Sequence, residues 1–173
     1  MSFKLLSEAV PIALGQRFKS FVSGEADPDR YILNYYRSEN KGQVYAHLVF
    51  GPLSQGPPGH VHGGAISAIF DELMGVCCWV NGYPALTAQY TTRFLKPVPL
   101  GKDMLFSAWI KDRDANKIVL KCELIDESEN RYAEGKGLFI SQDISTFEQM
   151  SKAGQSAHEH LQQFVSIQSG TKE

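Results

Sequence analysis

The sequence predicts an α+β domain in which one antiparallel sheet packs against a single long helix. One segment, 63–80, combines helical periodicity with enough length to form a central helix. The segments around it are rich in aromatic and β-branched residues and are joined by short polar connections. A run of strands with one helix among them is typical of α+β domains whose helix covers one face of the sheet.

Length and composition limit the possible roles of the chain. Its 173 residues predict one domain, and a hydrophobic content of 43% is enough for a real core. Seventeen basic residues face nineteen acidic ones, so charge gives no reason to expect a nucleic-acid partner. The three cysteines lack CxxC spacing, which favours neither a zinc site nor a disulfide framework and fits a reducing, cytoplasmic location.

Neither a membrane span nor a leader is expected from the sequence. No uninterrupted apolar run approaches the roughly 18 residues that a span requires, so stable membrane insertion is not expected. The first twenty residues hold too short an apolar stretch for a secretory signal, and Pro11 interrupts that stretch.

The chain divides into three predicted parts. Residues 1–29 are expected to be a helical N-terminal extension, with a helix over 3–23 that is broken or kinked near Pro11. Residues 30–141 hold the predicted sheet and central helix, and 142–173 form a polar tail that is expected to be partly helical.

Six segments of the central part read as strands. Two of them form a predicted hairpin, and four follow the helix: 30–38, 42–50, 85–95, 104–112, 116–126 and 131–141. A sheet of five or six strands with one helix leaves a face and two edges uncovered. Covering them favours a homodimer.

The segment 63–80 carries two different stripes on a helical wheel. The apolar stripe, suited to packing on the sheet, consists of Ile66, Ile69, Phe70, Leu73, Met74 and Cys77. The other stripe consists of small residues and one carboxylate: Gly64, Ser67, Asp71, Gly75 and Cys78. Small side chains permit a close approach, which fits either a tight packing contact with Asp71 as a cap or a ligand site with Asp71 as its acid.

The start of this helix, His62-Gly63-Gly64, is suited to binding an anion or a carbonyl oxygen that becomes one. The first N–H groups of a helix lack internal partners and carry the positive end of its dipole. Glycines remove the Cβ atoms that would keep a ligand away. With Asp71 nine residues after His62, the helix holds donors and a possible base, the components that hydrolysis of an activated acyl group needs. The same glycines also serve turn geometry alone.

The other histidines have simpler interpretations. His60 and His62 form an HxH pair that could ligate a metal, but no convincing third ligand lies nearby, and no metal is expected. His47 lies in an apolar strand and is expected to be structural. His158 and His160 lie in the polar tail and are expected to be solvated.

Two stretches together resemble a known family. "GPPGHVHGGAISAIFDELMG" (56–75) followed by "LTAQYTTRFLKPVPLG" (86–101) is similar to hotdog-fold acyl-CoA thioesterases of the 4-hydroxybenzoyl-CoA thioesterase superfamily. The resemblance covers roughly 30–141 and is greatest to the animal fatty acyl-CoA and bacterial phenylacetate-pathway branches. It implies an antiparallel sheet wrapped around one long central helix, and a homodimer, possibly doubled into a tetramer, with active sites at the dimer interface.

The resemblance also implies roles for individual residues. The Gly63 N–H would polarise the thioester carbonyl, Gly64 would give room, and His62 would orient the loop or touch the thioester. Asp71, donated by the other subunit, would be a general base or a nucleophile, and Thr87 would hold the water or the acid. Glu72 would point about 100° away from Asp71 and take no part. No cofactor is implied, because coenzyme A is part of the substrate.

Two groups of residues are weaker candidates for substrate binding. Arg93 and Lys96, at the end of the strand after the helix, could meet the phosphates of coenzyme A or simply be solvated. An apolar acyl pocket is suggested by three side chains of the helix: Phe70, Met74 and Trp79.

Hydrolysis of acyl-CoA to free acid and coenzyme A is the function that the sequence favours. A hotdog hydratase or dehydratase is an alternative, although it needs a His paired with an acid around a hydroxyacyl chain. A non-catalytic acyl-CoA-binding module is another, although binding alone does not require Asp71.

Overall fold

The computed structural model describes residues 3–13, 20–24, 27–39 and 42–150. It holds two short 3-10 turns, seven strands and two helices. They are η1 (Lys4–Leu6), β1 (Ala9–Ile12), β2 (Asn34–Ser38), β3 (Val44–Val49), η2 (Pro52–Ser54), α1 (Gly63–Val80), β4 (Ala85–Phe94), β5 (Asp103–Asp114), β6 (Lys117–Ile125), β7 (Arg131–Ser141) and α2 (Ile144–Met150).

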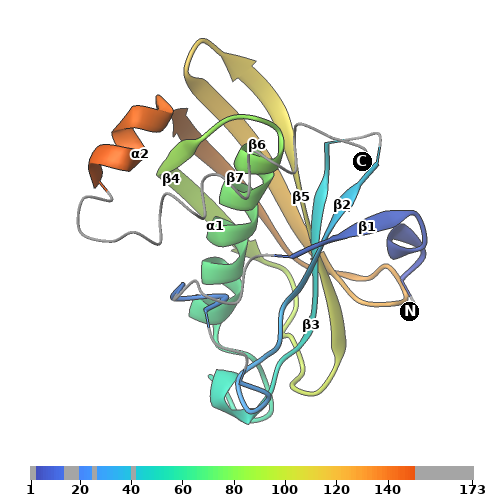
Figure 1. Ribbon diagram of the computed structural model, residues 1–173. Coiled ribbons are helices and arrows are strands. Elements are labelled where there is room, and N and C mark those ends of the chain that lie inside the picture. The colour runs from blue at the N-terminus through green and yellow to red at the C-terminus, as the bar shows by residue number, and fades with distance from the viewer. Residues whose placement is uncertain (1–2, 14–19, 25–26, 40–41, 151–173) are drawn as a thin grey trace.

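All seven strands join one antiparallel sheet in the order β1-β2-β3-β5-β6-β7-β4 (Figure 1). The predicted hairpin is confirmed as β2 and β3, and the four predicted strands after the helix are β4 to β7. After β3, which lies inside the sheet, the chain forms α1 and then returns as β4 at the edge next to β7. Consequently β1 and β4 are the two edges, and β4 runs alongside the central helix.

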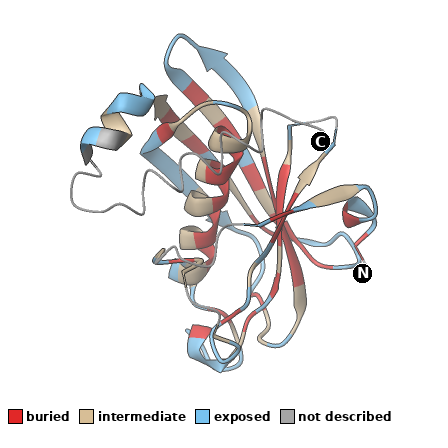
Figure 2. Ribbon diagram, in the orientation of Figure 1, coloured by how far each residue is buried: buried red, intermediate tan, exposed pale blue. Residues whose placement is uncertain are grey.

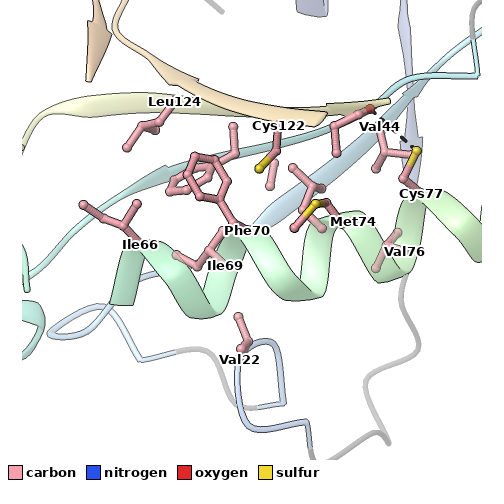
Figure 3. Close-up of a cluster of buried hydrophobic side chains, with 14 of the residues drawn as sticks. Val22, Val44, Ile66, Ile69, Phe70, Met74, Val76, Cys77, Cys122 and Leu124 are labelled. Carbon is pink, nitrogen blue, oxygen red and sulfur yellow. Dashed lines mark hydrogen bonds between the residues drawn. The ribbon is translucent and has the colours of Figure 1, made fainter. Parts of the chain in front are cut away.

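The core lies between α1 and the sheet that curves around it. Every residue of the predicted apolar stripe is buried, and the strand residues that face the helix form the other half of this cluster (Figures 2 and 3). Phe70, for example, meets the ring of Phe106 on β5 edge to face at 5.2 Å. The 3.6-residue period therefore identified the packed face of the helix correctly.

Glycines in β7 leave room for side chains that pack against this strand from α1 and from β6. A Cβ atom at Gly137 would lie 2.9 Å from the sulfur of Met74, and one at Gly135 would lie 2.6 Å from the sulfur of Cys122. Neither distance leaves space for a methyl group. A glycine inside a strand thus marks a close approach of the neighbouring element.

The prediction of an N-terminal helix over 3–23 is wrong for the described residues. Lys4–Leu6 is only a 3-10 turn, and Ala9–Ile12 is an edge strand paired with β2. Pro11 fits this edge position because an outer strand does not need every N–H. The apolar residues that suggested a helical stripe include Phe3 and Leu6, which pack instead with Tyr45 on the sheet face away from α1.

Part of the polar tail is helical, as predicted. The short helix α2 places Phe147 against Trp79 near the end of α1, with ring centroids 4.8 Å apart. Residues 151–173, with His158 and His160, lie outside the described part of the chain.

Helix α1 differs from one expectation, because by length and composition it could cross a membrane. Its 18 residues have a mean hydropathy of 1.4. The central helix of a soluble protein also passes that test, and α1 packs one face on the sheet.

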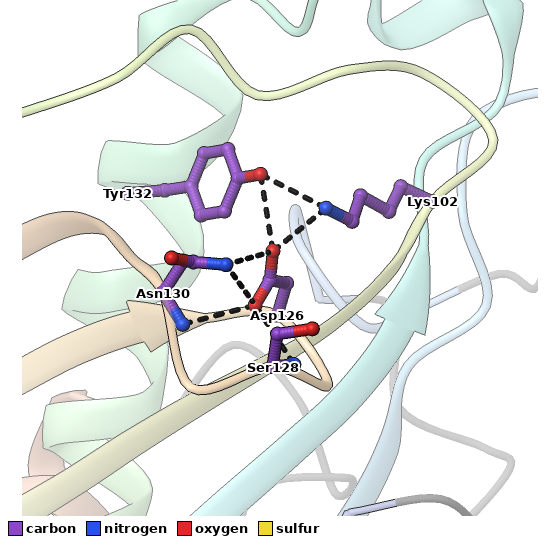
Figure 4. Close-up of polar contacts among 5 residues, drawn as sticks. All are labelled: Lys102, Asp126, Ser128, Asn130 and Tyr132. Atoms are coloured by element: carbon purple, nitrogen blue, oxygen red, sulfur yellow. Dashed lines mark hydrogen bonds and ion pairs between the residues drawn. The ribbon is translucent and has the colours of Figure 1, made fainter.

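A buried carboxylate organises the turn between β6 and β7 (Figure 4). Asp126 is 2% exposed and accepts hydrogen bonds from Lys102 Nζ at 2.7 Å, Tyr132 Oη at 3.2 Å and the Asn130 backbone N–H at 2.9 Å. Burial by itself raises the pKa of Asp126, but these donors outweigh it and hold the pKa well below its usual range.

Candidate active site

Strand β4 lies beside α1 yet stays open to solvent along most of its length. Its residues from Leu86 to Phe94 are exposed or half-buried, whereas the central strands are largely buried (Figure 2). A β-bulge between Thr87 and Gln89 shifts its register against β7. Cross-strand partners lie on the same face of a sheet. The β4 residues that pair with Phe139, Gly137, Gly135 and Ala133 of β7 therefore lie on the helix side. They are Thr87, Tyr90, Thr92 and Phe94.

The stripe of small residues on α1 faces this strand. Thr87 Oγ1 donates a hydrogen bond of 2.8 Å to Asp71 Oδ1, and Ser67 Oγ donates one of 3.3 Å to Thr92 Oγ1. Asp71 is only half-buried, so its second oxygen has room for a water molecule or a substrate atom. The expected partnership of Asp71 and Thr87 is thus present within one chain.

The start of α1 is capped by the side chain of His62. Its Nδ1 accepts the Gly64 N–H at 2.9 Å, so a neutral imidazole carries its hydrogen on Nε2. A Cβ atom at Gly64 would lie 2.8 Å from that Nδ1. The room at Gly64 is therefore taken by the His62 ring, and the ring consumes the Gly64 N–H.

The N–H of Gly63 is the donor left at this helix end. The Ala65 N–H bonds to the His62 carbonyl at 3.0 Å, and within the described residues the Gly63 N–H has no acceptor. The ring of Phe94 covers the position beside it, at 3.1 Å from where a Cβ of Gly63 would lie. A free N–H at the positive end of a helix is a suitable donor for a developing oxyanion.

The loop before the helix is fixed from both sides. The His62 N–H bonds to the Ser54 carbonyl at 2.8 Å, and the Val61 N–H bonds to the Val98 carbonyl at 2.9 Å. Gly59 has φ of +72°, which most other residues avoid, and a Cβ at Gly56 would lie 2.8 Å from His62 Cα. The density of glycine in this loop therefore has a conformational cause.

Gly63 and Asp71 do not meet in one chain. Eight residues separate them on α1, which at about 1.5 Å per residue is about 12 Å along the axis. A carbonyl held by the Gly63 N–H is therefore out of reach of the same chain's Asp71.

The two basic candidates do not lie with these residues. Arg93 Nη1 pairs with Glu134 Oε1 at 3.3 Å, and alternation along β4 directs Arg93 away from the helix side. Lys96 Nζ lies 5.8 Å from the ring centroid of Tyr132. Their contact with coenzyme A stays a prediction.

The histidine pair serves local structure. His60 Nδ1 contacts the Pro58 carbonyl at 2.9 Å, while His62 caps the helix. Across the described residues, no group of three His, Cys, Asp or Glu side chains is placed to hold a metal ion. His47, as expected of a structural histidine, has a partner: its Nε2 lies 2.8 Å from Asp103 Oδ1.

The sequence did not single out Thr92 or Phe94, which the structure adds to the candidate site. The alternation of residues along β4 could have identified both residues, but the bulge at Ala88 reverses which alternate residues face the helix after Thr87. The suggested acyl pocket is wrong for two of its residues, because Phe70 and Met74 are fully buried in the chain's own core.

A sheet curved around a central helix, with an N–H at the helix start that lacks an acceptor among the described residues and an acid on the helix, is the arrangement that the resemblance to hotdog-fold thioesterases implies. The thioesterase superfamily model matches residues 58–133, which include the helix start, Asp71 and Thr87. The similarity to this superfamily covers these residues, which are somewhat under half of the chain.

Relatives with curated functions and solved structures show the same similarity. Acyl-coenzyme A thioesterase THEM4 of Bos taurus is 35% identical over 95 residues, which are 54% of this chain and 38% of that protein. A crystal structure of a thioesterase superfamily protein is 27% identical with a TM-score of 0.61, covering 64% of this chain and 54% of that one. The PaaI protein of E. coli, 17% identical, shares the fold with a TM-score of 0.58 over 65% of this chain and 79% of its own. The match thus spans well under half of the bovine protein.

Proposed function

We propose that this chain hydrolyses the thioester of acyl-CoA to a free acid and coenzyme A. The observation that carries the proposal is the half-buried Asp71 carboxylate, which Thr87 holds in place on the open side of α1. The curated relatives that match this chain include acyl-coenzyme A thioesterases, which supports the same activity.

In this mechanism the Gly63 N–H binds the thioester oxygen and stabilises the negative charge that develops on it. Asp71 then takes a proton from a water molecule whose oxygen attacks the carbonyl carbon, or attacks that carbon itself to form an acyl-Asp71 anhydride that water afterwards hydrolyses to the free acid and the Asp71 carboxylate. The C–S bond breaks, and coenzyme A leaves as a thiolate that is protonated in solution. Donors and acids of this kind each account for roughly 10²–10⁴ in rate.

The active unit that we propose is a homodimer, because one chain's Gly63 and Asp71 are about 12 Å apart along α1. A two-fold axis beside the helix reverses its direction in the second copy and brings that copy's Asp71 toward the first copy's Gly63. The exposed edge strand β4 is ten residues long and carries exposed Tyr90 and Phe94, so pairing between two copies would cover it. Pairing of two such dimers into a tetramer belongs to the same proposal.

Release of free thiol from a panel of acyl-CoAs by the purified protein tests the activity. Hydrolysis of at least one acyl-CoA is the expected result. Hydration of an enoyl-CoA without hydrolysis would identify a hydratase instead, and tight binding with neither reaction would identify a binding module. We also propose a cytoplasmic location, which suits three cysteines that are all buried thiols.

A further inference from the structure

The second carboxylate of α1, Glu72, fastens another segment of the chain to the helix. Glu72 Oε2 accepts a hydrogen bond of 2.7 Å from Ser20 Oγ, and Oε1 accepts one of 2.8 Å from Tyr35 Oη. Burial, with the Glu72 charge as a second cause, raises the pKa of Tyr35, so the phenol remains a donor at any physiological pH. Glu72 is thus excluded from the Asp71 site but has a defined structural partner in Ser20.

Ser20 in turn shapes the turn formed by residues 20–24. Its Oγ accepts the N–H groups of Val22 at 3.2 Å and Ser23 at 3.3 Å. Val22 is buried and lies on the side of α1 opposite the sheet (Figure 3). The neighbouring Phe21 is 87% exposed. A turn that is anchored by one apolar residue therefore presents a second, larger one to solvent.

Phe21 stands at a cavity of about 270 Å³ that adjoins the helix start. Small residues of α1 line it together with the His62 cap: Gly64, Ala65 and Ala68. Leu53, itself 65% exposed, lines it as well. Two large exposed apolar side chains thus border a hollow whose helix side consists of small residues. Arg30, Tyr31, Ser54 and Gln55 complete its lining.

We infer that this cavity receives the acyl group of the thioester substrate and that Phe21 determines which acyl groups fit. The inference rests on the proposed function. The cavity shares His62 and Gly64 with the helix start, where the thioester carbonyl would bind, so the group attached to that carbonyl can extend into it. A hollow of about 270 Å³ offers space on the scale of a medium-length acyl chain or an aromatic ring. Covering Phe21 and Leu53 would remove apolar surface from water.

Glu72 is then a positioning residue for this specificity, acting through Ser20. It lies one turn beyond Ala68 on the same side of α1. Loss of the Ser20–Glu72 hydrogen bond would loosen the turn that carries Phe21 without touching Asp71 or Gly63.

The test compares kcat/KM for acetyl-, hexanoyl- and dodecanoyl-CoA. In Phe21→Ala the hexanoyl-to-acetyl ratio is expected to fall at least about tenfold, mainly through KM. Ser20→Ala is expected to lower the ratio in the same direction, and Ser20→Thr, which keeps the hydroxyl, to restore it. Ala68→Leu fills the cavity from the opposite side and is expected to exclude the longer chains.

Two control variants make the same kinds of substitution at residues that do not line the cavity. Leu5→Ala truncates an exposed apolar residue of η1, and Ser7→Ala removes a hydroxyl whose one partner among the described residues is the Lys4 carbonyl. Neither is expected to alter the ratio. Thermal unfolding establishes that each variant is folded, and Phe21 is exposed enough for its truncation to leave the core intact.

The outcomes separate this inference from the proposed function. If the wild type hydrolyses acyl-CoA and Phe21→Ala keeps the same chain-length profile, the inference is overturned and the proposed function stands. If Phe21→Ala weakens the dimer and leaves the ratio unchanged, Phe21 belongs to a subunit interface and the inference is also overturned. If the wild type hydrolyses no acyl-CoA, the proposed function itself fails and the inference falls with it.

Discussion

Thr87 Oγ1 and Asp71 Oδ1 are joined by a hydrogen bond of 2.8 Å that links the edge strand β4 to the central helix. The bond orients a half-buried carboxylate and occupies one of its two oxygens. The chemistry that we propose depends on that orientation.

Removing the charge of Asp71 tests its reactive role. Asp71→Asn keeps the shape and an acceptor for Thr87, so the protein is expected to fold and bind acyl-CoA while kcat falls by roughly 10²–10⁴. Steady-state hydrolysis measures the change, and Asp114→Asn, an exposed carboxylate at the end of β5, is the matched control. Unimpaired turnover in Asp71→Asn would remove Asp71 from the mechanism.

Thr87 is expected to act through its hydroxyl. Thr87→Val keeps the β-branched shape but loses the donor to a charged group, and we expect kcat to fall roughly ten- to hundredfold. Thr87→Ser keeps the donor and is expected to retain most of the activity. Thr91→Val, exposed on β4, serves as control, and equal rates for the valine and serine variants at position 87 would contradict this role.

The division of each site between two chains can be tested by mixing variants. Gly63→Pro deletes the free N–H, and proline suits this place because it is the first helical residue and His62 has φ of −66° and ψ of 132°. Gly63→Pro and Asp71→Asn are each expected to be nearly inactive.

Unfolding and refolding equal amounts of the two variants together should restore activity. Half of the dimers then contain both chains, and each of these has one intact site, so about a quarter of wild-type activity is expected. Gly63→Ala, which keeps the N–H, controls for the added bulk. No recovery in dimers that have been proved to mix would mean that both groups act within one chain.

The three cysteines are expected to be inert toward thiol reagents in the folded protein. All are buried, and burial raises the pKa of the Cys77 thiol to about 12 and raises those of Cys78 and Cys122 as well. At pH 8 a thiol reagent should react with none of them until urea unfolds the chain, when all three should react. Rapid labelling of the native protein would contradict this burial.

Acid should destabilise the fold through Asp126. Its pKa is lowered in the folded state, so its stabilising contribution is complete above the unfolded value of about 4 and declines as the pH falls below it. Asp126→Asn should therefore lower Tm by several degrees at pH 7, and the difference should shrink below pH 4. Asp143→Asn, an exposed control, should leave Tm unchanged, and a difference independent of pH would contradict the ionised Asp126 network.

The face of the sheet on which a residue lies does not follow from the sequence pattern alone. Simple alternation would put Thr87 and Arg93, six residues apart, on one face of β4. The bulge at Ala88 separates them, so Thr87 faces the helix and Arg93 the other side. The N-terminal segment was misread for a related reason, because Phe3 and Leu6 are spaced like a helical stripe but pack on the outer sheet face.

By itself, the sequence determined the elements whose signals are local. The helix over 63–80 follows from its 3.6-residue period and its glycine start, and the strands after it follow from their composition. It also indicated Asp71 and Thr87, through the family resemblance of two stretches. Tertiary structure alone decided that Thr87 touches Asp71, that Glu72 holds Ser20, and that Phe21 stands over a hollow beside the helix start. These contacts join residues 16 to 52 positions apart, and no local pattern encodes such pairings because they depend on how the sheet curves around the helix.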